Sequence, residues 1–525
     1  SSVNINSSSK DALKIFQPFL PIYVPVGIGF LLAAAERENI HAKHIDQQVE
    51  KNVFGLIEKY VMQMEKPYIF GFSVMTAAYR SSIIVSKKLK KLYPDSIICF
   101  GGIHPSAIPE EVLTNSHIDA VIRGEAEEIL PEFYRRVKGG KSFTDLNSLS
   151  FRKNGIVIHN QKKNNAIKDL DSLPPFPYHL FTSQQYDLGF VISSRGCPYK
   201  CIFCSNIIAT GKNYKCRSES AIVDELDLLY RKYGKTFVLF LDDNFLVSKK
   251  RIYKLIDEIK RKGLHEKMTF SFQARGDSAD EKLFRDLYNS GFRSVFFGME
   301  TASNRIMKVI KKGETVEECV SAARMAKRIG FHVSAAFIYG FPSETHKDRM
   351  DCVEISKNLE LDMVRFNNAT PYPGTSLYDI AKKEGRLNIQ GLYENFFSVS
   401  TFIENPFNKI PFSYVPIGST EKEIRNDILL SYLSFYTDLK KIKRIFSNPN
   451  EGVGWFYAGE KFLEMLKKLP ALILLAALLS VKFMQLIFDV FVKKNTHISY
   501  SEFMQILTLG QQIKNKLFFK FETKN

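Results

Sequence analysis

The sequence predicts an α/β protein with three parts: a Rossmann-like, doubly wound sheet, then a partial (β/α)6 barrel of the TIM type, then a helical C-terminal region. Two observations predict this architecture. Strand-like and helix-like segments alternate early in the chain and again through six strand candidates in its middle, before the alternation stops near Tyr393. We expect a first domain at residues 1–145, a hairpin and linker at 146–180, a barrel at 181–400 and a helical domain at 401–525.

The composition is that of a folded, multidomain chain. Its 525 residues are too many for one core, and 45% hydrophobic residues, with 43 Phe and 23 Tyr, supply ample core material. The net charge of +17 is compatible with nucleic acid or anionic lipid, but the sequence contains no basic-aromatic repeat or nucleic-acid module. We therefore expect no nucleic-acid partner. The polar start shows no signal peptide, and four of the seven cysteines are scattered singly, which predicts a cytoplasmic protein.

The first sheet is predicted from its alternating elements. In chain order these are a helix at 25–35, strands at 42–46 and 68–73, a helix at 81–92 and a strand at 96–100. A short hairpin at 149–159 is expected after this domain, ahead of the linker. Ligands of such sheets bind at the carboxyl ends of strands, where glycine allows close approach to the backbone. Ser73, Gly101 and Gly102 lie at such ends and are the candidate binding residues of this domain.

Three cysteines stand within eight residues, directly after the strand-like run 189–192. Cys197, Cys201 and Cys204 have the spacing C-x3-C-x2-C. Three thiolates suit a soft metal centre, and on a cubane of four irons they leave one iron free to bind another molecule. Zinc sites usually combine a C-x2-C pair with a second pair of ligands, and none follows here. The alternatives are a chance cluster or a disulfide loop.

This motif, with the aromatic Phe203 before its last cysteine, resembles the cluster loop of radical S-adenosylmethionine (SAM) enzymes. The resemblance implies a [4Fe-4S] cluster on the three cysteines, whose open iron chelates the amino and carboxylate groups of SAM. It also implies that one electron, from a donor such as flavodoxin or ferredoxin, cleaves SAM to a 5'-deoxyadenosyl radical.

Polar residues and glycines follow the barrel strands, and the ends of parallel strands share one rim, so we expect these residues to converge. The candidates for cofactor binding are Asp242, Asp243, Gln273, Arg275, Glu300 and Gly340. Carboxylates can accept hydrogen bonds from SAM, and a guanidinium can hold a carboxylate. The resemblance places Asp242 and Asp243 near the SAM amino group. It places Glu300 near the ribose and Gly340 in an adenine-side motif. For any single carboxylate, a helix cap or a salt bridge is the alternative.

Three segments of the first domain, at residues 71–73, 101–105 and 119–127, resemble the cobalamin-binding domain that precedes many radical SAM cores. The resemblance implies cobalamin as a third cofactor. None of the ten histidines has an aspartate two positions before it, so the D-x-H-x-x-G motif of other cobalamin domains is absent. The resemblance then implies a cobalt without a histidine ligand. A Rossmann-like domain that binds no cofactor is the alternative.

The C-terminal region is predicted to contain an amphipathic helix at 421–443 and an apolar run at 469–479. Lys482 interrupts that run too early for a membrane span. From residue 440 onwards fourteen Lys or Arg stand against six Asp or Glu, and lysine pairs at 467–468 and 493–494 flank the apolar stretch. This pattern predicts peripheral contact with an anionic membrane and a lipid-like or other small-molecule substrate. A helical cap packed on the barrel is the alternative.

Together these resemblances imply a cobalamin-dependent radical SAM enzyme. The reaction they imply is methylation of an unactivated carbon, with SAM as both methyl source and radical source. Oxidative cyclisation or another rearrangement of a tetrapyrrole or lipid-like substrate is the alternative among enzymes. A non-catalytic cobalamin or iron-sulfur sensor is the alternative from another class. The substrate itself is not specified by the fold.

Overall fold

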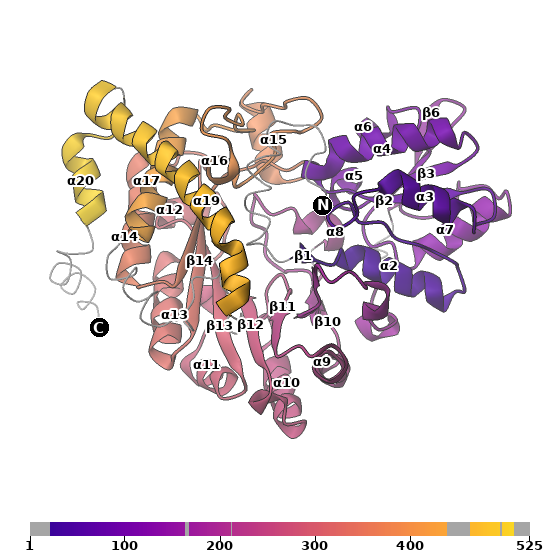
Figure 1. Ribbon diagram of the computed structural model, residues 1–525, viewed down its shortest axis with the longest axis horizontal. Helices are drawn as coiled ribbons and strands as arrows, with labels where there is room; N and C mark the ends of the chain where they lie inside the picture. Colours follow the sequence, from indigo (N-terminus) through magenta and orange to yellow (C-terminus); the bar gives the residue numbers. More distant parts are fainter. Residues whose placement is uncertain (1–21, 163–166, 212, 438–461, 494–495, 509–525) are drawn as a thin grey trace.

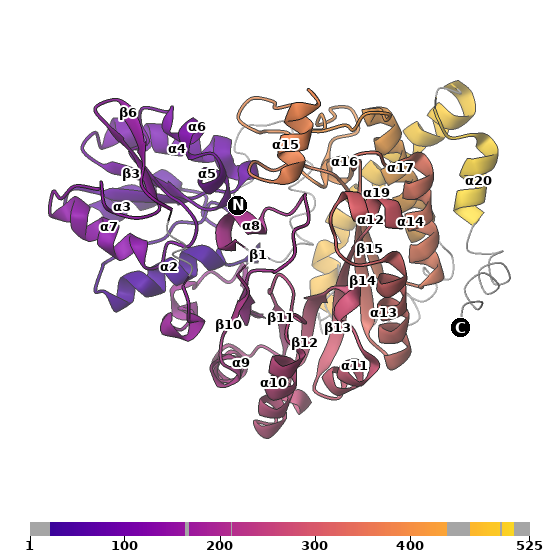
Figure 2. The same ribbon diagram turned by 180° about the vertical axis from the view of Figure 1, so that it is seen from behind.

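The computed structural model describes residues 22–162, 167–211, 213–437, 462–493 and 496–508. The N-terminal domain, the barrel and the C-terminal helices follow one another across the molecule, with the first domain at one end and the last helix at the other (Figure 1). The view from behind shows the same order (Figure 2). The predicted α/β architecture is confirmed.

The first domain is built on a five-stranded sheet of order β2-β3-β4-β5-β6. Its strands are β2 (Ile69–Ser73), β3 (Ile97–Gly101), β4 (Ala120–Ile122), β5 (Leu149–Lys153) and β6 (Ile156–His159). The first three pair in parallel, and β5 and β6 form the predicted hairpin, which pairs antiparallel with β4. The helices are α2 (Val26–Arg37), α3 (Val53–Val61), α4 (Tyr79–Leu92), α5 (Ile103–Ala107), α6 (Pro109–Leu113) and α7 (Ile129–Lys138). The hairpin therefore extends the first sheet, because β4 offers it a free edge.

The strand expected at residues 42–46 is wrong, since this segment has no regular secondary structure. It instead contacts residues 181–186, which precede the first strand of the barrel. Asp46 accepts a hydrogen bond of 3.1 Å from the hydroxyl of Tyr186, and the ring of His44 lies 4.6 Å from that of Phe181. Side-chain contacts with the second domain thus replace backbone pairing with the first sheet.

The barrel strands form one parallel sheet in chain order, as predicted, because each βα unit returns the chain to the same edge (Figure 1). They are β8 (Phe190–Val191), β11 (Phe237–Phe240), β12 (Thr269–Ala274), β13 (Phe292–Glu300), β14 (His332–Tyr339) and β15 (Met363–Asn368). The helices between them are α9 (Glu219–Tyr233), α10 (Lys249–Arg261), α11 (Glu281–Tyr288), α12 (Asn304–Val309), α13 (Val316–Ile329) and α14 (His346–Asn358). Alternate residues such as Phe270 and Phe272 are fully buried, whereas Ser271 and Gln273 on the other face are accessible. The sheet therefore keeps one face open.

The C-terminal region is helical, as predicted. It comprises α17 (Glu421–Tyr436), α19 (Phe462–Phe488), a π-helical turn η8 (Asp489–Lys493) and α20 (Tyr500–Thr508). Two short helices, α15 (Ser376–Lys383) and α16 (Ser400–Ile403), lie between β15 and this region. The amphipathic pattern expected for 421–443 does not hold in the described part of that helix, because Arg425 and Asp427 are buried in ion pairs with Glu404 and Arg349. Residues 438–443 lie outside the described residues. α17 is thus an internal helix in contact with α14, β15, α19 and α20.

Candidate active site at the cluster loop

The cluster loop begins at β9 (Ser194–Arg195), which pairs antiparallel with β10 (Lys215–Cys216). Its path requires Gly196, whose φ is +86° and where a side chain would collide with the carbonyl oxygen of Asn213. The three cysteines that follow, called the cluster cysteines, are partly accessible free thiols: Cys197, Cys201 and Cys204. Sequence reasoning found the cysteines but not the reason for the glycine before them.

The residues between the cluster cysteines fix the loop to the barrel. The amide of Ile202 donates to the carbonyl of Ile310 at 3.0 Å, and the amide of Leu377 donates to the carbonyl of Ile202 at 2.9 Å. The ring of Phe203 lies 5.4 Å from that of Phe341. Phe203, the aromatic residue of the motif, therefore packs the loop against Phe341, which lies just after β14.

Burial raises the pKa of each of these thiols, that of Cys204 to about 11. The nearby cations Lys312 and Arg275 act in the opposite direction on Cys197 and Cys201. The unligated thiols are therefore neutral near pH 7, and a metal must displace their protons to bind. Cationic side chains beside the loop favour the thiolate form that iron requires.

The two predicted aspartates after β11 hold the start of the cluster loop. Asp242 is buried and accepts from the amides of Ser193 and Ser194 at 2.7 and 3.0 Å. Asp243 accepts from the amide of Gly196 at 3.0 Å. Ser193 also bonds the guanidinium of Arg251 through its carbonyl, at 2.9 Å. Both carboxylates thus position the backbone directly before Cys197, and their contact with SAM stays a prediction.

A network of charged side chains surrounds the loop. Lys312 donates to Glu300 at 3.0 Å and lies 3.5 Å from Glu314. Arg275 pairs with Asp277 at 2.9 Å and lies 4.0 Å from Glu314. All of these side chains except that of Asp277 are nearly inaccessible to solvent. Each buried carboxylate therefore needs a cation beside it. The structure therefore brings Arg275 and Glu300 together, as expected for rim residues.

Sequence reasoning missed Lys312 and Glu314, which follow α12 and not a strand. Gly313 between them has a φ of +75° and would place a side-chain carbon 3.8 Å from the guanidinium of Arg275. A glycine between two oppositely charged residues was the available signal, because such a turn can direct both side chains toward one site.

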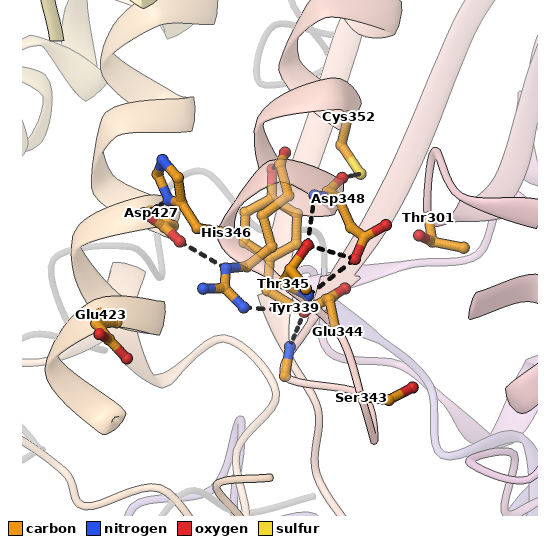
Figure 3. Close-up of polar contacts among 12 residues, drawn as sticks. Thr301, Tyr339, Ser343, Glu344, Thr345, His346, Asp348, Cys352, Glu423 and Asp427 are labelled. Atoms are coloured by element: carbon orange, nitrogen blue, oxygen red, sulfur yellow. Dashed lines mark hydrogen bonds and ion pairs between the residues drawn. The ribbon is translucent and has the colours of Figure 1, made fainter. Parts of the chain in front are cut away.

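Gln273 and Gly340 lie at the ends of β12 and β14 but belong to different surroundings. Gln273 is accessible on the open face of the sheet. Gly340 is buried, and its amide donates to the carboxylate of Glu344, which Figure 3 shows beside Thr345. Burial raises the pKa of Glu344 to about 8. Gln273 is thus available to a ligand, whereas Gly340 supports a buried carboxyl group; the binding role of each remains a prediction.

The predicted cobalamin edge is an accessible strand end. Ser73 is exposed and pairs with Gly101 across β2 and β3. A side-chain carbon at Gly101 would meet the carbonyl of Ile122 at an ordinary 3.6 Å. At Gly102, whose φ is +95°, it would lie 2.9 Å from the backbone of Val74. The backbone conformation therefore requires glycine at position 102. At position 101 a side chain would fit the fold, and glycine instead leaves the space in front of the strand free for a ligand.

A buried charge cluster, called the interdomain clamp, joins this domain to the cluster loop. Arg195 lies 3.1 Å from Glu125 and 2.7 Å from Glu127, and Lys215 lies 2.7 Å from Glu125. The two glutamates follow β4 and the two cations lie on the β9–β10 pair. Next to the clamp, α5, which begins after Gly102, packs against α8 (Asn206–Thr210), which follows the last cluster cysteine. The edge that carries Gly101 and Gly102 is thus joined to the cluster loop.

The donor groups fit the cofactors that the sequence implies. Three thiols on one loop, with cations beside them, could ligate three irons of a [4Fe-4S] cluster and would leave its fourth iron open. The strand end at Ser73 and Gly101 is accessible and could offer its backbone to a large flat ligand. A parallel half-barrel with such a loop, next to a doubly wound domain, defines the class of radical SAM enzymes that carry a cobalamin domain.

Comparison with known proteins agrees with this class. Residues 191–355 match the radical SAM superfamily, and residues 16–134 match the B12 binding domain. An uncharacterized methyltransferase of Pyrococcus horikoshii is 32% identical over 431 residues, which are 81% of this chain and 90% of that protein. The anaerobic magnesium-protoporphyrin IX monomethyl ester cyclase of Cereibacter sphaeroides is 24% identical over 73% of this chain and 62% of its own length.

Two solved structures share the fold. The cobalamin-dependent S-adenosylmethionine radical enzyme OxsB has a TM-score of 0.63 at 17% identity, covering 94% of this chain and 83% of OxsB. The radical S-adenosylmethionine methyltransferase TsrM from Kitasatospora setae has a TM-score of 0.60 at 18% identity, covering 70% of this chain and 75% of TsrM. The chain belongs to the family of cobalamin-dependent radical SAM enzymes. Its cofactors are a [4Fe-4S] cluster, SAM and cobalamin.

Proposed function

We propose that the chain methylates an unactivated carbon of a hydrophobic small molecule. The observation that carries the proposal is the junction of the cobalamin edge with the cluster loop through the interdomain clamp and the α5–α8 contact. When bound, the cluster and SAM supply a carbon radical, and cobalamin carries a methyl group derived from SAM. The contacts between the cobalamin edge and the cluster loop support this proposal, because both cofactors would then act on one substrate.

The open face of the barrel presents apolar side chains among polar ones, which suits a small molecule with an apolar part. Phe296 and Ile338 are partly accessible on this face, and Arg365 lies above the ring of Phe296 with its guanidinium carbon 5.7 Å from the ring centre. Gln273 and Asn367 add two amides to this face. Apolar walls with a few polar groups are typical of small-molecule sites, in which the polar groups set the orientation.

The test is the product ratio of the anaerobically reconstituted protein given reductant and SAM labelled in its methyl group. Methylation with SAM in both roles produces S-adenosylhomocysteine and 5'-deoxyadenosine in equal amounts, with the label in the substrate. The variant with all three cluster cysteines changed to Ala should form no 5'-deoxyadenosine. 5'-Deoxyadenosine without S-adenosylhomocysteine would reject methylation.

Oxidative cyclisation is the second candidate, because the cyclase of Cereibacter sphaeroides is 24% identical to this chain. The same experiment separates the two reactions, since a cyclisation consumes SAM only as radical source and leaves the methyl label in methionine. Either reaction needs a low-potential electron, for which we propose a small donor such as flavodoxin or ferredoxin.

We also propose that a cytoplasmic form of the enzyme touches an anionic membrane through α19. Among the described residues no helix is long and apolar enough to cross a bilayer. Lys482, Leu486 and Val490 face the protein, one helical turn apart. The side chains of Ile473 and Met484 are 63% and 60% exposed. An apolar outer face beside lysines is typical of helices that lie at lipid headgroups.

Flotation with anionic vesicles at low and high salt tests this contact. Changing Ile473 and Met484 to Glu should abolish flotation, because the outer face then carries charge. Changing Met62, which is 82% exposed on the first domain, to Glu is the matched control and should have no effect. Equal flotation of all three proteins, or none, would leave α19 as a cap on the barrel.

A further inference from the structure

A group of metal-ligand side chains that the proposed reaction does not use lies where α14, α17 and the segment before α20 meet. His346 begins α14, Asp427 lies within α17, and His497 precedes α20. Figure 3 shows His346 and Asp427 side by side where the two helices meet. Three segments far apart in the sequence thus bring two imidazoles and one carboxylate to a single point.

The donor atoms have the spacing of a single metal site. Nδ1 of His346 lies 2.9 Å from Oδ1 of Asp427, Nε2 of His497 lies 2.7 Å from the same oxygen, and the two nitrogens are 3.1 Å apart. Zinc bonds of about 2.0–2.1 Å in a tetrahedron separate neighbouring ligand atoms by about 3.3 Å. A zinc ion would therefore need the three atoms to spread by only about 0.2–0.6 Å.

The ligands are oriented by partners of the kind that metal sites use. Nε2 of His346 lies 2.9 Å from a carboxylate oxygen of Glu502, and Arg349 donates to the second oxygen of Asp427. A ligating histidine usually donates its other ring N–H to a carboxylate, which fixes the ring and raises its basicity. Asp427 is fully buried, whereas His346 and His497 are partly accessible, so an ion has a path from solvent.

The charges also favour a cation. Asp427 and Glu502 both contact His346, and Arg349 balances one of these carboxylates. The second carboxylate, on Glu502, has a side chain that is 37% exposed and is left to pair with His346 or with a metal ion beside it. The approach of the two imidazole nitrogens to one carboxylate oxygen favours the metal, because an ion replaces all three short contacts with bonds at once.

We propose that His346, His497 and Asp427 form a zinc site that fastens the C-terminal segment to the barrel. With three protein ligands the fourth position is open to water. The ion would link α14 directly to α17 and to the segment that leads into α20. Removing it should loosen α20 while the cluster cysteines keep their iron.

The test measures iron and zinc together in reconstituted protein that has been dialysed against zinc. The wild type should hold about one zinc per chain beyond its iron, and His497→Ala should lose the zinc but keep the iron. His332→Ala, at the opposite end of β14 from His346, is the matched control and should retain both metals. Glu502→Gln should keep the site but weaken zinc binding by about 10–100-fold, measured by competition with a chelator.

A second readout covers variants that fold poorly. Added zinc should raise the melting temperature of the wild type and of His332→Ala, since a ligand of the folded state stabilises it, but not that of His497→Ala. Wild-type protein that binds no zinc, or His497→Ala that binds it as the wild type does, would overturn the proposal. A hydrogen-bonded, protonated His346 would then account for the cluster.

Discussion

Arg195 joins the two domains through buried contacts with two glutamates. It directly precedes Gly196 in the cluster loop, and its guanidinium lies between Glu125 and Glu127 of the first domain. Burial would lower the pKa of Arg195, but the two glutamates more than offset this and raise it. Replacing Arg195 with Met keeps most of the side-chain volume and removes the charge.

The expected loss of stability follows from the charged groups that remain after Arg195 is replaced. Lys215 still pairs with Glu125 at 2.7 Å, but Glu127, only 5% exposed, loses the cation that contacts it. Removing one partner of a buried ion pair costs about 3–5 kcal/mol, because the remaining charge is left without compensation. On a surface pair the same change costs about 1 kcal/mol or less.

The assay is denaturant unfolding, together with hydrogen exchange in peptides from the β9–β10 pair. Arg195→Met should lower the free energy of opening these strands by about 3–5 kcal/mol. Arg261→Met, which removes an exposed ion pair with Glu258 on α10, is the matched control. Adding Glu127→Leu to Arg195→Met should recover part of the loss, since it removes the unpaired carboxylate. The reasoning fails if Arg195→Met is no more destabilising than Arg261→Met.

Three further predictions concern the cofactors and the C-terminal helix. Changing all cluster cysteines to Ala should abolish bound iron and sulfide, measured chemically, because thiolate bonds hold the cluster; undiminished iron would contradict this. Gly101→Ala should lower cobalamin content, measured by absorbance, without lowering the melting temperature, whereas Gly102→Ala should lower both because it strains the backbone; equal stability losses would refute the distinction, and histidine coordination of cobalt in the spectra would contradict the expected cobalt environment. Burial lowers the pKa of Lys482 to about 8, so the folded state binds fewer protons than the unfolded state and α19 should dock more tightly as pH rises from about 8 to about 10. Hydrogen exchange of α19, corrected for intrinsic rates, should show this trend in the wild type and not in Lys482→Met.

Local sequence pattern was enough for the elements that depend on neighbouring residues. Six runs of apolar residues ending in polar residues or glycine predicted the barrel strands, because a buried parallel strand needs a short apolar run and its end meets the rim. The cluster cysteines were predicted as ligands for the same reason, since thiols that share one metal centre on one loop are close in sequence; their ligation of iron stays a prediction. The hairpin at 149–159 was found from its turn residues.

Contacts between distant segments could not be found in this way. Residues 42–46 were predicted as a strand, yet the pairing of Asp46 with Tyr186 holds them against the barrel. The glycine turn beside Lys312 gives no sign of its buried partner Glu300, because Glu300 lies at the end of β13 and meets Lys312 only in the folded chain.

The sequence by itself determined the periodic elements and the metal loop, because their signals lie within a few residues of one another. Only the tertiary structure decided which charges meet. Arg195 finds its partners in another domain, and His346 meets Asp427 and His497 across gaps of 81 and 151 residues. Burial makes these charges interdependent, and burial is a property of the folded chain that no local pattern encodes.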